Sequence, residues 1–214
     1  MATVLIIGAS KGIGLETVKQ ALKAGHTVRA MARSAVRVPG RHAHLETVKG
    51  DALDPESVKQ ALSGVDAVIQ TLGVSAGPDM ILKPVRLFSD ATRVLVAAME
   101  ESGVKRLICL TGFGAGDSRN RGGFFYNKAF KLFLGRAYDD KTVQERIIRE
   151  SGLDWVIVRP GILTNHRPTS AYRVLIDPRE WRPGFISRAD VADFLVKQIE
   201  DDTYIGQTPV LVNP

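Results

Sequence analysis

Three glycines directly after the first apolar segment restrict this chain to few kinds of fold. Residues 3–7 form a short apolar run, Gly8, Gly12 and Gly14 follow it, and an amphipathic helical pattern begins at once. A strand that passes through a glycine-rich turn into a helix is the layout of a dinucleotide-binding βα unit. In that unit the first glycine permits the sharp turn, the second lets a pyrophosphate approach the backbone, and the third lets the helix pack against the sheet.

The start of this predicted helix is suited to bind phosphate. Free N–H groups and the positive end of the helix dipole both face the turn. The glycines are spaced Gly-x-x-x-Gly-x-Gly, and a tight turn with a purely structural role is the alternative explanation. We expect the cofactor-binding residues of the turn to be Gly8, Ser10, Lys11, Gly12, Ile13 and Gly14.

The segment after the second predicted strand, residues 27–32, indicates which dinucleotide is bound. An Asp or Glu usually holds the ribose 2′-hydroxyl of NAD here, but no acidic residue lies between Glu16 and Glu46. Arg33 stands at that position, and Arg37 lies one short loop turn further on. Because a planar guanidinium matches a phosphate, we expect both arginines to bind the 2′-phosphate of NADP(H). A solvated basic loop is the alternative.

Length and composition fit a single α/β domain spanning residues 1–214. The chain has 214 residues, 44% of them hydrophobic, which is enough for one well-filled core. Its only cysteine, Cys109, cannot form an internal disulfide, and this suits a reducing compartment. No apolar run approaches the length of a membrane span, and Met1 leads straight into the first strand without room for a signal peptide. We therefore expect a cytoplasmic protein that does not enter a membrane.

The net charge of +6 does not require a nucleic-acid partner. Basic residues are spread over several segments without a dense basic run, and a polyanionic cofactor with an acidic substrate accounts for them. We expect a small-molecule partner, no nucleic acid, and a monomer or dimer. His42 and His44 would alternate along one strand face, but no Cys or carboxylate joins them at ligand spacing, so we expect no metal site.

Strand-like and helix-like segments alternate along the chain. Such alternation, with nearly continuous apolar strands, predicts a doubly wound parallel sheet of Rossmann-like type with helices on both faces. Asp54 and Ser187 are expected to cap helices, and Gly103 is expected to end one. The further predicted strands are 44–49, 66–70, 105–110, 153–158 and 209–212, and the further helices are 55–62, 85–102, 124–135, 139–151 and 188–200.

Loops at the carboxyl ends of the strands are the expected ligand-binding loops of such a sheet. Asp51, beside Ala52, would accept a hydrogen bond from the adenine amino group, unless it is an ordinary turn residue. Leu72 and Gly73 follow the fourth strand, where a glycine would let the cofactor pass closely, unless it serves only the turn.

The chain resembles the short-chain dehydrogenase/reductase superfamily in its atypical branch. The resemblance is nearest to the NAD(P)H-binding group that includes flavin reductase/biliverdin-IXβ reductase and NmrA-like proteins. It implies that Arg33 and Arg37 hold the 2′-phosphate and that Asp51 and Ala52 flank the adenine. It also implies a nicotinamide site lined by Leu72, Gly73, Thr111, Pro160, Gly161 and Ile162. The matching segments run nearly end to end, at residues 7–14, 32–34, 50–54, 64–69, 103–106, 150–155, 158–161 and 186–192.

The catalytic residues are less clearly marked. Many members of the superfamily use a Tyr-x-x-x-Lys pair, which this chain lacks. Lys141 matches the family's lysine, but Ala137 stands at the tyrosine position, with Tyr138 one residue later. Tyr138 and Lys141 are three residues apart and could share a helix face, so Tyr138 is either a general acid or a packing residue. Thr111 either orients the acceptor or bonds to local backbone.

Two segments are predicted to cover the substrate. Residues 112–126 hold five glycines and three phenylalanines, which is typical of a mobile lid or a disordered loop. Residues 165–185 hold four arginines with Tyr172 and Trp181, which would suit a planar anionic acceptor or form a solvated face.

Three functions follow from these patterns. The first is an NADP(H)-dependent oxidoreductase that transfers hydride to a planar acceptor of flavin, quinone or tetrapyrrole type. The second is a regulatory protein that senses NADP(H) without turnover, like the NmrA-like relatives, and the missing Tyr-x-x-x-Lys pair favours it. A sugar-nucleotide epimerase or dehydratase is disfavoured by the missing tyrosine and by the little chain left for a substrate domain.

Overall fold

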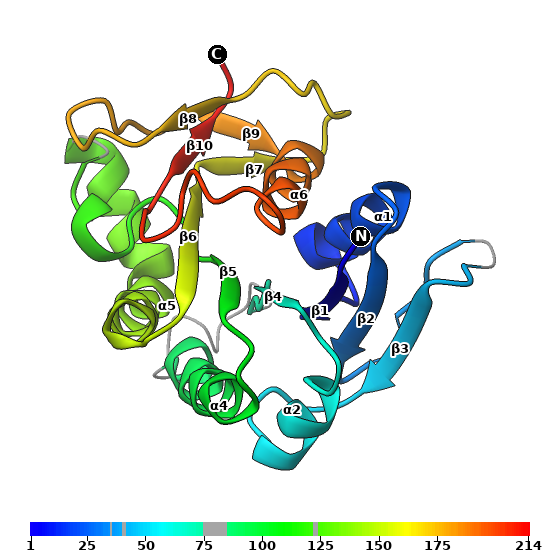
Figure 1. Ribbon diagram of the computed structural model, residues 1–214. Coiled ribbons are helices and arrows are strands. Elements are labelled where there is room, and N and C mark those ends of the chain that lie inside the picture. Colours follow the sequence, from blue (N-terminus) through cyan, green and yellow to red (C-terminus); the bar gives the residue numbers. More distant parts are fainter. Residues whose placement is uncertain (35, 40–41, 75–84, 122–123) are drawn as a thin grey trace.

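A mostly parallel sheet forms the centre of the protein in the computed structural model (Figure 1). The structure describes residues 1–34, 36–39, 42–74, 85–121 and 124–214, with the side chains of 124–133 left aside. The strand order is β3-β2-β1-β4-β5-β6-β10-β8, and of these strands only β8 runs antiparallel to its neighbour. The strands are β1 (Thr3–Ile7), β2 (Thr27–Ala32), β3 (Leu45–Lys49), β4 (Ala67–Gln70), β5 (Arg106–Leu110), β6 (Asp154–Pro160), β8 (Arg173–Leu175) and β10 (Val210–Val212).

Helices cover both faces of the sheet, so the predicted Rossmann-like doubly wound fold is confirmed. On one face α1 packs against α6, and on the other α4 packs against both α5 and α2. A second sheet of two parallel strands, β7 (Ile162–Thr164) and β9 (Phe185–Ser187), lies after β6. The helices are α1 (Gly12–Lys23), α2 (Pro55–Ala61), α4 (Leu87–Ser102), α5 (Phe124–Glu150) and α6 (Arg188–Lys197).

Side chains of the central strands alternate between two apolar cores. Val4 and Ile6 pack with the inner faces of α1 and α6, whereas Leu5 and Ile7 pack with those of α2, α4 and α5. Both faces of β1 are therefore buried, which explains its uninterrupted apolar sequence. Each such side chain stabilises the fold by roughly 1.5–3 kcal/mol relative to an exposed position.

The predicted helix boundaries are confirmed where a capping residue marks them. Asp54 accepts a hydrogen bond from the Ser57 N–H at 3.1 Å, with Pro55 at the first helical position of α2. Ser187 caps α6, and Gly103 ends α4 with φ of +76°.

Other boundaries were predicted wrongly. The structure has one helix, α5, where two were expected at 124–135 and 139–151. Gly135 alone costs only about 1 kcal/mol in a helix, which is too little to end one packed on a sheet. The α6 helix stops at Lys197 rather than at residue 200, and β6 continues through Pro160 because β10 pairs with it there. β3 begins at Leu45, so His42 and His44 precede it and do not alternate along a strand.

The two predicted covering segments are partly built into the fold. Phe113 is buried with Leu175 and Trp181, and its N–H donates to the Pro160 carbonyl at 2.9 Å. The first part of 112–126 is thus packed rather than open, residues 122 and 123 lie outside the described residues, and residues 124–126 begin α5. In 165–185 the aromatic rings are also engaged, because Trp181 is buried and the Tyr172 hydroxyl donates to Asp193 at 2.7 Å. The buried Trp181 ring is therefore not available to stack on an acceptor, and the Tyr172 hydroxyl is tied to α6.

Asp190 has a structural role. Its buried carboxylate accepts hydrogen bonds from the backbone N–H groups of Thr169 and Ser170, both at 2.8 Å, and from the Ser187 hydroxyl. Burial opposes ionisation, but these hydrogen bonds prevail and lower the pKa of Asp190 below its usual range. Through these hydrogen bonds the carboxylate holds the loop of residues 165–172 against the start of α6.

Candidate active site

The order of the strands places the glycine-rich turn at the switch point of the sheet. The chain builds outward from β1 to β3 and then returns to the other side of β1 with β4, so β1 and β4 flank the switch. Gly8 follows β1 and Thr71 follows β4, and the Thr71 N–H donates to the Ile7 carbonyl at 2.8 Å. Ligands of doubly wound folds bind in this position.

Two of the three glycines are required by packing. A Cβ on Gly8 would lie 2.8 Å from the Thr71 carbonyl oxygen, and Gly8 has φ of +88°. A Cβ on Gly14 would collide with the Gly8 carbonyl and lie 2.6 Å from the Thr71 hydroxyl. The first turn of α1 therefore lies directly against the ends of β1 and β4.

Gly12 differs, because a Cβ there would meet none of the described residues within 4 Å, although its φ is +59°. The residue lies on the open side of the turn. No side chain caps α1, and its first turn holds no acidic residue, in contrast to the capped α2 and α6. An uncapped helix start beside an unobstructed glycine fits the pyrophosphate of a dinucleotide. Ser10, Lys11 and Ile13 lie in the same turn, and Ile13 is buried.

The residues predicted for the adenosine half follow the neighbouring strands. Arg33 directly follows β2 and is exposed, as is Arg37. Asp51 and Ala52 follow β3, where the Asp51 carboxylate accepts a hydrogen bond from the Leu53 N–H at 3.1 Å. Asp51 therefore forms a local turn, and its second oxygen is left for other contacts.

The residues predicted for the nicotinamide half follow β4 and β6. A Cβ on Gly73 would meet no atom of the described residues within 4 Å, which leaves room beside Leu72 among these residues. Pro160 ends β6, and a Cβ on Gly161 would collide with the carbonyl of Gly184. The next residue, Ile162, is 41% exposed, and its strand partner Phe185 is 59% exposed.

The end of β5 brings Thr111 and Lys141 together. Lys141 projects from α5, and its ammonium donates to the carbonyl oxygens of Thr111 at 3.0 Å and Leu110 at 3.4 Å. The same ammonium lies 4.3 Å from the centre of the Phe88 ring. The side chain is buried, at 8% exposure.

Burial alters the acid–base chemistry of Lys141. It lowers the pKa of the ammonium from 10.5 to about 8, against the opposing charges of Glu145 and Asp140. A group that titrates close to neutral pH can hold and release a proton during a reaction. Cys109 lies nearby in β5, where burial raises the pKa of its thiol to about 12, so it stays protonated.

Tyr138 also faces the end of β5. A Cβ on Gly112 would collide with the Tyr138 hydroxyl, so the ring tip lies directly against this glycine. The Tyr138 carbonyl accepts from the Thr142 hydroxyl at 2.8 Å, and Thr142 in turn accepts from the Gly116 N–H at 3.0 Å. The structure thus brings Tyr138, Lys141 and Thr111 to one strand end.

Sequence patterns did not reveal the buried ion pair beneath Thr111. The Thr111 hydroxyl donates to the Glu145 carboxylate at 2.7 Å, and Arg159 binds both oxygens of that carboxylate at 3.0 and 2.5 Å. Arg159 also contacts Asp117 at 2.5 Å. Burial opposes the charge on Arg159, but its two carboxylate partners raise its pKa above the ordinary value. The sequence held one signal for this pair, because Arg159 lies within the otherwise apolar run of β6.

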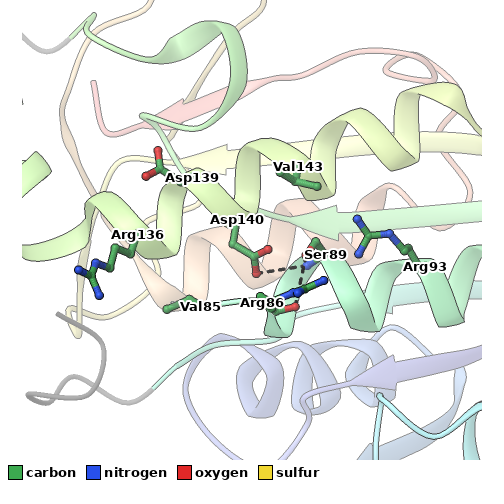
Figure 2. Close-up of a pocket in the computed structure, with 8 residues that line it drawn as sticks. All are labelled: Val85, Arg86, Ser89, Arg93, Arg136, Asp139, Asp140 and Val143. Carbon is green, nitrogen blue, oxygen red and sulfur yellow. Dashed lines mark hydrogen bonds between the residues drawn. The ribbon is translucent and has the colours of Figure 1, made fainter. Parts of the chain in front are cut away.

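A cavity of about 430 Å³ lies between α4 and α5 (Figure 2). Asp140 spans the two helices there, because its carboxylate accepts from the backbone N–H groups of Phe88 at 2.8 Å and Ser89 at 3.3 Å. It thereby caps α4 from a neighbouring helix. None of the predicted cofactor or catalytic residues lines this cavity, whose lining is Val85, Arg86, Ser89, Arg93, Arg136, Asp139, Asp140 and Val143.

The described residues include neither a metal-binding cluster nor a membrane-spanning helix. The His, Cys, Asp and Glu side chains in these parts of the chain form no group of three that could hold a metal ion. No helix within the same ranges is long and apolar enough to cross a membrane.

Comparison with known proteins gives a family match over most of the chain. Residues 8–202 match the model of the family described as NAD(P)H-binding. The Bacillus subtilis protein named "Uncharacterized sugar epimerase YhfK" is 29% identical, over 97% of this chain and 96% of that protein. TIC 62 of Arabidopsis thaliana is 32% identical over 79% of this chain, which spans only 28% of that longer protein.

A solved structure is similar over nearly its full length. It is ChuY of Escherichia coli O157:H7, described as an anaerobilin reductase. The two chains share 28% identity with a TM-score of 0.80, and the match covers 99% of this chain and 97% of ChuY.

Proposed function

Because the chain belongs to the NAD(P)H-binding family, we propose that it is an NADP(H)-dependent reductase that transfers hydride to a planar acceptor. The observation that carries this proposal is the buried Lys141 ammonium at the end of β5. Its lowered pKa gives the site a proton-holding group beside the residues predicted to line the nicotinamide. A protein that only sensed the cofactor would have no need of one.

The chain's own residues would bind and orient both reactants. When bound, NADPH supplies the hydride. The glycine-rich turn would hold its pyrophosphate, while Leu72, Gly73 and Pro160–Ile162 would border the nicotinamide. Lys141 holds a proton at Nζ and fixes the strand end through two carbonyl oxygens. Proximity and orientation would then provide most of the rate enhancement.

The acceptor is proposed to be flat and partly apolar. Ile162 and Phe185 are exposed neighbours on β7 and β9, and paired residues of parallel strands project to the same face. The similarity to ChuY, described as an anaerobilin reductase, supports a tetrapyrrole-like acceptor. Exposed arginines in 165–185, such as Arg173 and Arg182, would suit its carboxylates.

Steady-state oxidation of NADPH by the purified protein tests the proposed function. A linear tetrapyrrole, free flavin and a small quinone would be offered in turn, with NADH run in parallel. We expect turnover with NADPH well above that with NADH for at least one acceptor. Tight NADPH binding without turnover on any of them would contradict the proposal.

The Arg33→Ala variant tests the choice of NADPH. We propose that the exposed Arg33 guanidinium binds the 2′-phosphate, so its loss should raise the dissociation constant for NADPH about tenfold and leave that for NADH unchanged. The matched control is Lys105→Ala, which also removes one exposed positive charge. Lys105 directly precedes β5, at the end of the sheet away from the predicted ligand-binding loops. Unchanged relative affinities in Arg33→Ala would remove the reason to name NADP.

A sensor of NADP(H) without turnover is the second candidate. The missing Tyr-x-x-x-Lys pair favours it, since Ala137 occupies the tyrosine position and is buried. A sugar-nucleotide epimerase, which the name of the relative YhfK suggests, is the third. Neither accounts for a buried lysine of lowered pKa in the absence of that tyrosine.

A further inference from the structure

The Thr111 hydroxyl is held by a chain of buried contacts that joins the end of β5 to α5 and β6. Its hydrogen is directed at Glu145 Oε1, 2.7 Å away. That same oxygen accepts from Arg159 Nε at 3.0 Å, and the second carboxylate oxygen accepts from Arg159 Nη2 at 2.5 Å. Glu145 is 1% exposed and Arg159 is fully buried. A two-point pair of this kind fixes the carboxylate in one orientation.

This arrangement restricts what the Thr111 hydroxyl can do. A hydroxyl has one hydrogen and two lone pairs, and its hydrogen is already committed to a carboxylate. The oxygen is left as a hydrogen-bond acceptor, which recognises an N–H group and cannot protonate a ligand. The proton of the reduction must then come from another group.

Stability alone gives a poor account of these buried charges. Ion pairs in protein interiors are often no more stabilising than apolar residues of similar size. One nitrogen of the pair, Arg159 Nη1, is buried without a hydrogen-bond partner among the described residues. Gly116 closes over the pair with φ of +53°, and a Cβ there would lie 2.6 Å from Arg159 Nη2. The backbone turn is thus shaped around the pair.

We propose that Glu145, clamped by Arg159, is a positioning residue that makes Thr111 an acceptor-only contact for an N–H group of the bound ligands. The inference rests on the proposed function. Two ligand groups have this chemistry, namely the carboxamide of nicotinamide and a ring N–H of a flavin or tetrapyrrole acceptor. A quinone has no such donor.

A mutant cycle tests the proposal. Thr111→Val removes the hydroxyl at nearly constant shape, and Glu145→Leu with Arg159→Met replaces the pair by apolar residues that should still fold. Thr111→Val and the double variant should each lower kcat/KM about tenfold. The triple variant, which combines them, should lose no more than Thr111→Val or the double variant alone. Thr111→Ser, which keeps the hydroxyl, should restore most of the activity.

The control exchanges an exposed ion pair in the same way. Lys59 and Glu101 pair on the surface between α2 and α4, so Lys59→Met with Glu101→Leu should leave kcat/KM unchanged. If the pair beneath Thr111 were only structural, the losses from Thr111→Val and from the double variant would multiply. That result, or full activity in Thr111→Val, would overturn the proposal.

The acceptor panel separates the two ligand groups. An equal loss in Thr111→Val with every acceptor would assign the N–H to the nicotinamide carboxamide. A loss with flavin and tetrapyrrole but not with quinone would assign it to the acceptor ring. If none of the acceptors supports oxidation of NADPH by the wild-type protein, the proposed function fails, and the positioning role is tested separately. The dissociation constant for NADPH is then measured for the same variants. If the triple variant loses no more NADPH affinity than Thr111→Val alone, the positioning role is supported. If no variant loses affinity, the positioning role is overturned.

Discussion

Alanine in place of Gly12 is expected to weaken NADPH binding about tenfold or more, while alanine in place of Gly25 leaves it unchanged. Both glycines have positive φ, +59° and +87°, and a Cβ on either would meet no atom within 4 Å in the part of the chain that the structure describes. Both substitutions should therefore cost a similar 1–2 kcal/mol, roughly, in backbone strain. Only Gly12 lies in the turn proposed to hold the pyrophosphate, so only its methyl group would occupy ligand space.

The comparison separates binding from stability. The free energy of unfolding would be measured in urea for both variants, and NADPH affinity by calorimetry. Equal stability losses with unequal affinities are the expected pattern. Equal affinities would show that the open side of the turn is not where the cofactor lies.

The Lys141→Met variant is expected to lose activity while gaining stability at neutral pH. The folded-state pKa of Lys141 is about 8, against 10.5 for the ordinary side chain, so folding works against its charge. This difference lowers the free energy of unfolding of the wild-type protein by about 3 kcal/mol at any pH where the lysine is charged in both the folded and the unfolded state. General acid–base groups commonly contribute about 100-fold or more to turnover, so a loss of that size is expected.

The pH dependence gives the signature of this lysine. Below about pH 8 both states are protonated, and the wild-type protein should stay less stable than Lys141→Met by a constant amount. Between about pH 8 and 10.5 the unfolded chain binds a proton that the folded protein has lost, so wild-type stability rises and the gap closes. Glu145, Asp140 and Cys109 face the same ammonium and are unchanged in the variant.

Activity should follow the protonated form of Lys141. Wild-type turnover is expected to fall as pH rises through about 8. Lys105→Met, an exposed lysine at the other end of β5, should change neither profile. A stability gap that does not vary with pH would contradict the lowered pKa, and normal activity in Lys141→Met would exclude the lysine from the reaction.

Local patterns predicted those parts of the molecule whose cause is local. The glycine turn, the Asp54 and Ser187 caps and the apolar strands each follow from residues close in sequence. The single α5 helix was missed because packing against the sheet outweighs one glycine. The short strands β7, β8 and β9 were missed because their pairing partners lie elsewhere in the chain.

The site divides in the same way. The positions of Gly8, Gly12 and Gly14 could be read from their spacing, since one turn contains them all. The contact of Glu145 with Arg159 could not, because it joins α5 to β6 across the interior. Trp181 was expected to face a ligand, yet its ring lies over the Arg159 guanidinium at 5.0 Å. A sequence shows that an aromatic residue is present but not which side of the fold receives it.

Direct hydride transfer within one complex is the most decisive point to measure. In an anaerobic single-turnover experiment, protein in excess would be mixed with NADPH and one tetrapyrrole, and both absorbances followed together. The proposed function predicts that NADPH and acceptor disappear in one phase at a ratio of one to one, even if product release is slow. Bound NADPH that remains fully reduced, with that acceptor and with flavin and quinone, would contradict it and favour a sensor or an acceptor outside this panel.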